Sequence, residues 1–347
     1  MSAAAAREPR VSDYVARCLA DERIPVIDVG AYLAGDVDAL ERLAVDLRAI
    51  QESLGFYCIV NHGVDQALVD RSFERVAELF DLPLETKMKY RVDFHHIGYI
   101  PTKATVLRWS TIAENRKKDL NEAWAFMRER APDDPKVTAN VRHRGLNKWP
   151  AELPQFRPTI LAYQEAMAVL AAKMLPAYAR ALELPGDWFA DRFSLPEYYN
   201  RCAYYPPAQA EEGQFSLAPH SDHSSITYLP LMDVPGLQVM APSKRWIEVE
   251  PVRGAMVVNT GEFLNRWTNG RFIATPHRVV PPKARRYALT FFYNANDETV
   301  ATPMPTCIRP GEAPRYEPMS FHDFFVTYMD GNYIYRTAEM DEGAVAG

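Results

Sequence analysis

The feature that most constrains the fold is a change of hydrophobic period near residue 199. From there to residue 294 the chain consists of short segments, separated by turn residues, in which polar and apolar side chains alternate. Alternation with a period of two is typical of β-strands that bury one face. The segments are 201–206, 214–219, 224–231, 236–240, 246–250, 255–259, 273–280 and 286–294, and the clearest turn is Asn269-Gly270. Eight short strands predict a double-stranded β-helix, the cupin-like jelly roll that often carries a metal site.

The residues before this region have a different pattern. IPVIDV (24–29) and GFYCIV (55–60) are typical of buried strands, whereas 38–55, 65–80 and 154–184 have the spacing of helices. In the last of these, Ile160, Tyr163, Met167, Leu170 and Met174 form one apolar stripe. The sequence therefore predicts a mixed α and β protein in which a helical N-terminal region packs on the jelly roll. We divide it into an N-terminal α/β region (1–195), a catalytic jelly roll (196–300) and a C-terminal closing segment (301–347).

Composition narrows the classes of partner. The 347 residues are 48% hydrophobic, which is enough for a large core, and the formal charge of −6 without a basic cluster argues against nucleic acid. Four cysteines without paired spacing indicate reduced thiols. The first ten residues lack the apolar core of a signal peptide, and no apolar run reaches membrane length. We expect a soluble cytoplasmic protein that does not bind a membrane.

His220 and Asp222 are the first candidate ligands for a metal ion. They stand two residues apart, so in a strand their side chains point to the same face, and His277 follows 55 positions after Asp222. Two imidazoles and one carboxylate on one side of a metal form the facial triad of non-haem Fe(II) oxygenases. A His-x-Asp pair alone is a weak signal, because it also occurs by chance in cores and on surfaces. Arg286 opens a later strand, where its guanidinium suits a carboxylate.

Several longer motifs strengthen this interpretation. They are HSDHSS (220–225), PGLQV (235–239), VVNTGEF (257–263), TNGRFIATPHRVV (268–280) and RYALTFF (286–292), preceded by IPVIDV, GFYCIVNHGV and FDLPLETK. In this order, the chain resembles the isopenicillin N synthase-like Fe(II)/2-oxoglutarate-dependent oxygenases from residue 24 to about 294. The resemblance implies Fe(II) on His220, Asp222 and His277, and 2-oxoglutarate on Arg286 and Tyr205. It also implies that O2 oxidises a small organic molecule, by hydroxylation, desaturation or cyclisation, with release of succinate and CO2.

Two residues depart from the family pattern. Ala288 stands where the family has the serine of Arg-x-Ser, and Ala203 stands where an asparagine often precedes the tyrosine. A lost hydrogen bond to a charged group weakens binding by roughly ten- to a hundredfold. An oxidase on the same scaffold that does not use 2-oxoglutarate in the usual way is therefore an alternative, because isopenicillin N synthase itself keeps the arginine. A zinc hydrolase and a non-catalytic binding module are further alternatives.

The substrate pocket is predicted from position in the family pattern. Phe292 occupies the place of an aromatic residue that stacks on substrate in relatives, and Tyr99, Arg108 and Trp109 lie in the region that lines the substrate entrance. Ordinary packing is the alternative for each of them. With these aromatics and the arginines Arg108 and Arg266, we expect a small substrate that is partly aromatic or bears a carboxylate.

Overall fold

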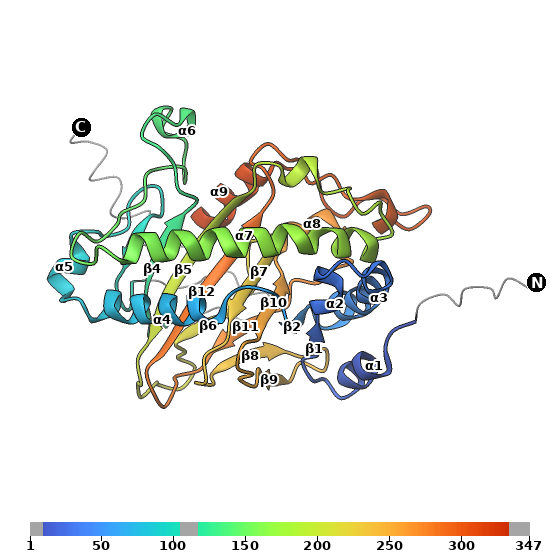
Figure 1. Cartoon of the computed structure of the whole chain (residues 1–347), viewed down its shortest axis with the longest axis horizontal. Coiled ribbons are helices and arrows are strands. Elements are labelled where there is room, and N and C mark those ends of the chain that lie inside the picture. Colours follow the sequence, from blue (N-terminus) through green and yellow to red (C-terminus); the bar gives the residue numbers. More distant parts are fainter. Residues whose placement is uncertain (1–9, 105–116, 333–347) are drawn as a thin grey trace, which may run out of the picture.

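The structure is a computed structural model, and it describes residues 10–104 and 117–332 (Figure 1). Two sheets form its centre. The larger has the order β1-β2-β10-β7-β12-β5-β4-β3, and the smaller has the order β6-β11-β8-β9. The strands are β1 (Val26–Asp28), β2 (Phe56–Val60), β3 (Gly98–Ile100), β4 (Glu122–Met127), β5 (Glu197–Tyr205), β6 (Leu217–His220), β7 (Ile226–Pro230), β8 (Leu237–Met240), β9 (Trp246–Glu248), β10 (Met256–Thr260), β11 (His277–Val279) and β12 (Arg286–Asn294).

The prediction of eight short strands is confirmed by β5 to β12, which follow the predicted segments in order. The neighbouring strands in both sheets are antiparallel except for the β1–β2 pair. The sequence did not indicate β3 and β4, which extend the larger sheet beyond β5. Strand β4 reads EAWAFM, in which only the first residue is polar, so it shows no alternation of polar and apolar residues. A search for alternating polar and apolar residues does not detect such a strand.

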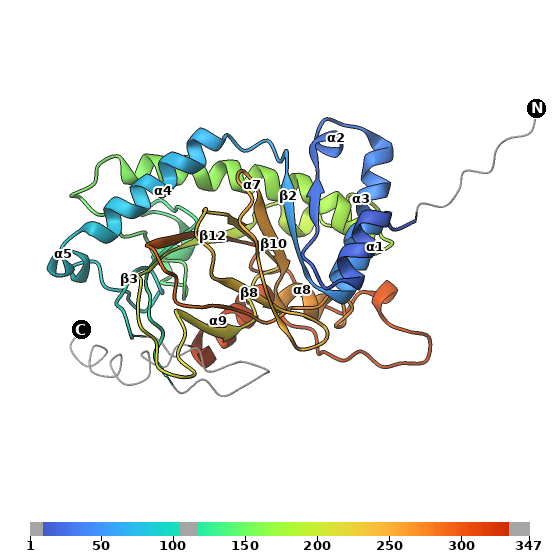
Figure 2. The ribbon, with the colours of Figure 1, turned by 90° about the horizontal axis from the view of Figure 1, so that it is seen from below.

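Helices cover the outer face of the larger sheet. In Figure 1 the long helix α7 (Phe156–Ala181) runs across the sheet, and Figure 2 shows α7 on one side of β10 and β8 on the other. The Tyr163 hydroxyl donates to the Leu289 carbonyl of β12 at 3.1 Å, which fixes the helix to the sheet. The other helices are α1 (Asp13–Ala20), α2 (Gly30–Leu33), α3 (Val37–Ser53), α4 (Gln66–Asp81), α5 (Leu84–Met88), α6 (Pro135–Thr138), α8 (Glu262–Trp267) and α9 (Phe321–Asn332), with 3-10 turns at Asp191–Phe193 and Pro305–Cys307.

The apolar stripe predicted for residues 154–184 is the buried face of α7. Ile160, Met167 and Met174 on it are fully buried in the core between helix and sheet. Among the helices that the structure describes, none has the length and hydropathy needed to cross a bilayer.

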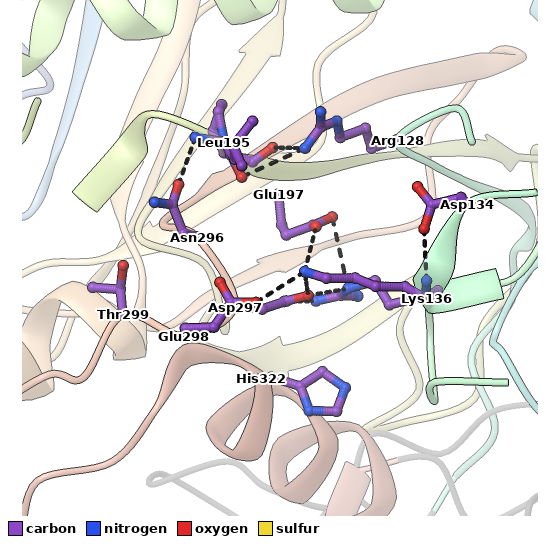
Figure 3. Close-up of polar contacts among 12 residues, drawn as sticks. Arg128, Asp134, Lys136, Leu195, Glu197, Asn296, Asp297, Glu298, Thr299 and His322 are labelled. Carbon is purple, nitrogen blue, oxygen red and sulfur yellow. Dashed lines mark hydrogen bonds and ion pairs between the residues drawn. The ribbon is translucent and has the colours of Figure 1, made fainter. Parts of the chain in front are cut away.

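A buried ion-pair network joins the start of β5 to the chain that follows β12 (Figure 3). Lys136 Nζ lies 2.6 Å from Asp297 Oδ2 and 3.7 Å from Glu197 Oε1, so it bridges the two carboxylates. Arg144 pairs with Asp297, and Arg130 pairs with Glu197. Each of these carboxylates therefore has more than one cationic partner, which buried charges require. The network holds the connection between β4 and α7 against the sheet.

Candidate active site

A cavity lies between the two sheets, and α9 contributes to its wall. Most of the strands of the jelly roll line it, which places residues distant in sequence around one space. Its polar lining residues are Tyr199, Arg201, Tyr205, His220, Asp222, His223, Thr227, Asn259, His277, Arg286, Thr290 and Tyr328.

Two imidazoles and one carboxylate converge in this cavity. His220 at the end of β6 pairs in register with His277 at the start of β11, and their ring centroids are 4.3 Å apart. Asp222 Oδ1 lies 3.7 Å from His220 Nε2 and 3.5 Å from His277 Nε2. Three potential ligand atoms from these residues lie within 4.8 Å of one another, and all three residues are buried. The arrangement fits one metal ion held from one side.

The backbone fixes which imidazole nitrogens face the metal position. His220 Nδ1 lies 2.9 Å from the carbonyl of Ala218, and His277 Nδ1 lies 3.2 Å from the carbonyl of Thr275. Because a carbonyl oxygen only accepts hydrogen bonds, each Nδ1 is the donor, which leaves each Nε2 as the nitrogen that can bind a metal. Both rings therefore present a metal-binding nitrogen toward Asp222.

Two neighbours orient the Asp222 carboxylate. Thr227 Oγ1 donates to Asp222 Oδ2 at 2.7 Å, and Asn259 Nδ2 donates to the same oxygen at 2.8 Å. These bonds engage Oδ2, whereas Oδ1 faces the imidazoles. Partners of this kind hold metal ligands in place and tune their basicity. In the sequence Asn259 is visible only as part of the VVNTGEF motif, so its contact with Asp222 is a contribution that the sequence did not indicate.

Burial and charge shift the pKa of all three residues. Burial and then the nearby His277 lower the pKa of His220 to about 3. Burial also lowers the pKa of His277, but the charge and hydrogen bond of Asp222 outweigh it, so this pKa lies above its ordinary value. Burial raises the pKa of Asp222, and the charge of His277 with its hydrogen bond overcomes this to give a pKa far below the usual range. Asp222 is thus ionised. His277 binds a proton that a metal ion would have to displace in order to bind.

Arg286 at the start of β12 has the surroundings of an anion site. It is 4% exposed, and its guanidinium carbon lies 5.0 Å from the centre of the Tyr205 ring. Within residues 10–104 and 117–332, Nε and Nη1 of Arg286 have no hydrogen-bond partner. Two buried donors without acceptors are costly, so a ligand with a carboxylate fits them well. Burial lowers the pKa of this guanidinium, and Tyr205 opposes the effect.

Aromatic side chains form the opposite end of the cavity. Phe292 and Tyr199 stack with ring centroids 4.5 Å apart, and the Tyr199 hydroxyl lies 2.5 Å from His223 Nε2. Tyr328 of α9 joins this wall, with its ring 5.2 Å from His223, and its hydroxyl donates to the Ser221 carbonyl at 2.6 Å. Phe292 therefore lines the cavity, and α9 contributes Tyr328 to the same wall.

Tyr99 does not line the cavity, which corrects the prediction made for it. It lies on β3 at the far edge of the larger sheet, where its hydroxyl donates to Glu122 Oε2 at 2.5 Å. Lys87 Nζ also pairs with this carboxylate at 2.8 Å, and the Trp124 ring packs against Tyr99. The tyrosine completes a buried polar cluster in the core. Arg108 and Trp109 lie outside the described residues.

Arg201 on β5 is a cavity residue that the sequence did not single out. It is 8% exposed, and its Nη2 donates to Asn121 Oδ1 at 2.8 Å. The only signal was its position four residues before Tyr205, which puts both side chains on one face of a strand. That signal does not say what the face meets, and only the packing of the two sheets shows that Arg201 lines the cavity.

Comparison with known proteins agrees with this geometry. The family model described as 2OG-Fe(II) oxygenase superfamily matches residues 196–295, and that described as non-haem dioxygenase in morphine synthesis N-terminal matches residues 24–152. The 2-oxoglutarate-Fe(II) type oxidoreductase hxnY of Emericella nidulans is 31% identical over 86% of this chain and 87% of its own. Azadirone synthase LFS of Melia azedarach is 31% identical over 86% of this chain and 88% of its own.

Solved structures show the same fold. A full-length Neurospora crassa protein in complex with alpha-KG has a TM-score of 0.78 at 25% identity, covering 88% of this chain and 96% of its own. JOX2 in complex with 2OG, Fe and JA has a TM-score of 0.72 at 26% identity, covering 88% of this chain and 84% of its own. Family membership sets aside the zinc hydrolase and the non-catalytic module. The chain belongs to the 2OG-Fe(II) oxygenase superfamily and is a non-haem dioxygenase that uses Fe(II), 2-oxoglutarate and O2.

Proposed function

We propose that this enzyme oxidises an unactivated C–H bond of a small organic molecule. The primary outcome is hydroxylation, in which substrate, O2 and 2-oxoglutarate give hydroxylated product, succinate and CO2. Desaturation and ring closure are variants at the same site. His220, Asp222 and His277 hold Fe(II), while Arg286 and Tyr205 hold the far carboxylate of 2-oxoglutarate. When bound, the metal and the keto acid together supply the activation of O2.

The observation that carries this proposal is the pair of buried donors on Arg286. Nε and Nη1 point to no acceptor in the described part of the chain, yet they lie in the same cavity as the triad. A dicarboxylic acid joins the two features, because one end suits a metal and the other suits a guanidinium. The departures at Ala203 and Ala288 remove possible hydroxyl and amide partners but leave these two donors intact.

The protein itself supplies position and a dry environment. Phe56, Leu217 and Val257 contribute apolar walls near the ligands, and Phe292 with Tyr199 closes the far end. Such walls exclude water and fix a target carbon near the metal position. Solved relatives were crystallised with thymine, with 5-formyluracil or with JA, which supports a small organic molecule as substrate.

An anaerobic titration with Fe(II) and 2-oxoglutarate tests the assignment, followed by measurement of oxygen uptake and succinate. We expect Arg286→Met to weaken 2-oxoglutarate binding by about a hundredfold or more, because two charge-assisted hydrogen bonds are lost. The matched control is Arg285→Met, whose guanidinium is exposed and pairs with Asp81. Protein that is loaded with iron and produces no succinate with any small acid under air would refute the proposal.

A further inference from the structure

A short chain of hydrogen bonds runs from Ser224 to the metal position. The hydroxyl oxygens of Ser224 and Thr227 are 2.7 Å apart, and Thr227 Oγ1 donates to Asp222 Oδ2 at 2.7 Å. A hydroxyl group has a single hydrogen to donate. Because Thr227 gives its hydrogen to Asp222, its oxygen accepts in the other bond, and Ser224 is the donor there. The chain therefore runs in one direction, from Ser224 through Thr227 to Asp222.

The two hydroxyl groups lie in the protein interior. Ser224 is fully buried and Thr227 is 2% exposed, so bulk water does not compete for their hydrogen bonds. In such surroundings each donor polarises the next one, and the bond from Ser224 makes Thr227 a better donor to the carboxylate. Gly261 leaves the room that the serine needs, because an added Cβ there would lie 2.7 Å from Ser224 Oγ. The fold thus accommodates the serine hydroxyl closely.

Asp222 Oδ2, at the end of this chain, accepts a second hydrogen bond. Asn259 Nδ2 donates to it at 2.8 Å. A carboxylate has about four lone-pair sites, two on each oxygen, so the two donors occupy both sites of Oδ2. Oδ1 instead lies 3.5 Å from His277 Nε2 and 3.7 Å from His220 Nε2. One carboxylate oxygen is thus taken by the protein, and the other lies with the imidazole nitrogens.

We propose that Ser224 is a positioning residue of the metal site. Acting through Thr227, it keeps Asp222 Oδ2 occupied, so that Asp222 binds the metal through Oδ1 alone. A carboxylate that bound through both oxygens would take one of the positions that a facial triad leaves open. The chain of hydroxyl groups therefore preserves the open face of the site. This inference concerns how the metal is held, and it does not depend on which bond the enzyme oxidises.

Metal affinity in single and double variants provides the test. Fe(II) is titrated without oxygen into wild-type protein, Ser224→Ala, Thr227→Val and the double variant. We expect Ser224→Ala to weaken Fe(II) binding by about three- to tenfold, as for one neutral hydrogen bond, and Thr227→Val by roughly ten- to a hundredfold. In protein that already carries Thr227→Val, adding Ser224→Ala should change the affinity by less than about twofold, because the serine has lost its acceptor. An equal loss from Ser224→Ala in both backgrounds, or no loss in the wild-type background, overturns the proposal.

Ser225 provides a matched control beside Ser224. It is also a fully buried serine, and its Oγ has no hydrogen-bond partner in the described part of the chain. Its backbone amide donates to Asn294 Oδ1 at 3.0 Å, and a change of side chain leaves this donor in place. Ser225→Ala should therefore leave the Fe(II) affinity within about twofold. A loss equal to that in Ser224→Ala would show that any change in this turn weakens the site, and it would overturn the specific role of Ser224.

A conservative variant distinguishes positioning from packing. Thr227→Ser keeps the hydroxyl, so it should retain the Fe(II) affinity within about threefold, whereas Thr227→Val should not. Should Ser224→Ala fail to fold, equal Fe(II) affinities in these two variants also overturn the proposal, because the hydroxyl at position 227 would then carry no effect to Asp222.

The number of carboxylate oxygens on the metal is tested with Co(II) in place of iron. The visible absorption of Co(II) depends on the number and arrangement of its ligands. Thr227→Val frees one site on Asp222 Oδ2, so its Co(II) spectrum should differ from that of wild-type protein, with a smaller change in the same direction for Ser224→Ala. Ser225→Ala should give the wild-type spectrum. Identical Co(II) spectra in all four proteins overturn the proposal that the chain keeps Oδ2 from the metal.

Discussion

Asn259 and Asp222 are 37 positions apart, and the amide of Asn259 donates to Asp222 Oδ2 at 2.8 Å. The bond joins β10 of the larger sheet to the segment that follows β6, two residues beyond His220. Gly261 permits this approach, because a Cβ there would lie 2.1 Å from the Ser224 carbonyl oxygen. The turn after Asn259 and the metal site are thus built as one unit.

The first prediction concerns this bond. Asn259→Ala should weaken Fe(II) binding by roughly ten- to a hundredfold, because the carboxylate loses a partner that sets its orientation. Anaerobic titration with Fe(II) measures the change. Asn296→Ala is the control, since Asn296 donates to the Asp191 carbonyl far from the cavity. Equal iron affinity in the two variants would show that Thr227 alone is sufficient to hold Asp222.

The second prediction is a dependence of metal affinity on pH. In the metal-free protein His277 keeps its proton to a pKa above the ordinary 6.5, whereas the pKa of His220 is about 3. A metal ion must displace the His277 proton at any pH below that raised pKa. Apparent Fe(II) affinity should therefore fall about tenfold per pH unit below it and level off above it. Titrations from about pH 5.5 to about pH 8.5 check this, and a constant affinity throughout would contradict it.

The third prediction concerns Ala288, which lines the cavity and pairs with Ala203 between strands β12 and β5. Ala288→Ser adds a hydroxyl two residues from Arg286, on the same face of β12. If 2-oxoglutarate lies there, the new hydrogen bond to its carboxylate should tighten binding by about tenfold or more. Calorimetry under anaerobic conditions measures it. Thr290→Ser is the control, because it changes a cavity residue without adding a hydroxyl. Unchanged 2-oxoglutarate affinity in Ala288→Ser would mean that 2-oxoglutarate does not reach Ala288 and Ala203.

The fourth prediction tests the position of Tyr99. Tyr99→Phe removes the donor to buried Glu122, so the free energy of unfolding should fall by about 1–3 kcal/mol. Kinetic constants for substrate and 2-oxoglutarate should stay within about twofold, since Tyr99 lies outside the cavity. Urea unfolding and steady-state kinetics on the same preparation measure both. A raised KM for the substrate without a loss of stability would indicate that Tyr99 lies at the substrate entrance.

The sequence by itself determined the elements whose period is regular. The alternation from β5 to β12 and the stripe on α7 identified the layers, because side-chain direction repeats every two residues in strands and every 3.6 in helices. The same rule predicted that His220 and Asp222 share a face. Family motifs added His277 and Arg286.

Tertiary structure alone decided which of these faces meet. The antiparallel register sets Arg201 opposite Thr290 and Phe292 opposite Tyr199, and no local pattern encodes that register. The tertiary structure also places the Asn259 amide within hydrogen-bond distance of Asp222, and it places Tyr99 in a buried polar cluster with Glu122. Periodicity fixes the direction of a side chain within its own strand. The neighbour that it meets depends on hydrogen bonds between strands that are far apart in the chain, so the site was visible only in part before the fold was known.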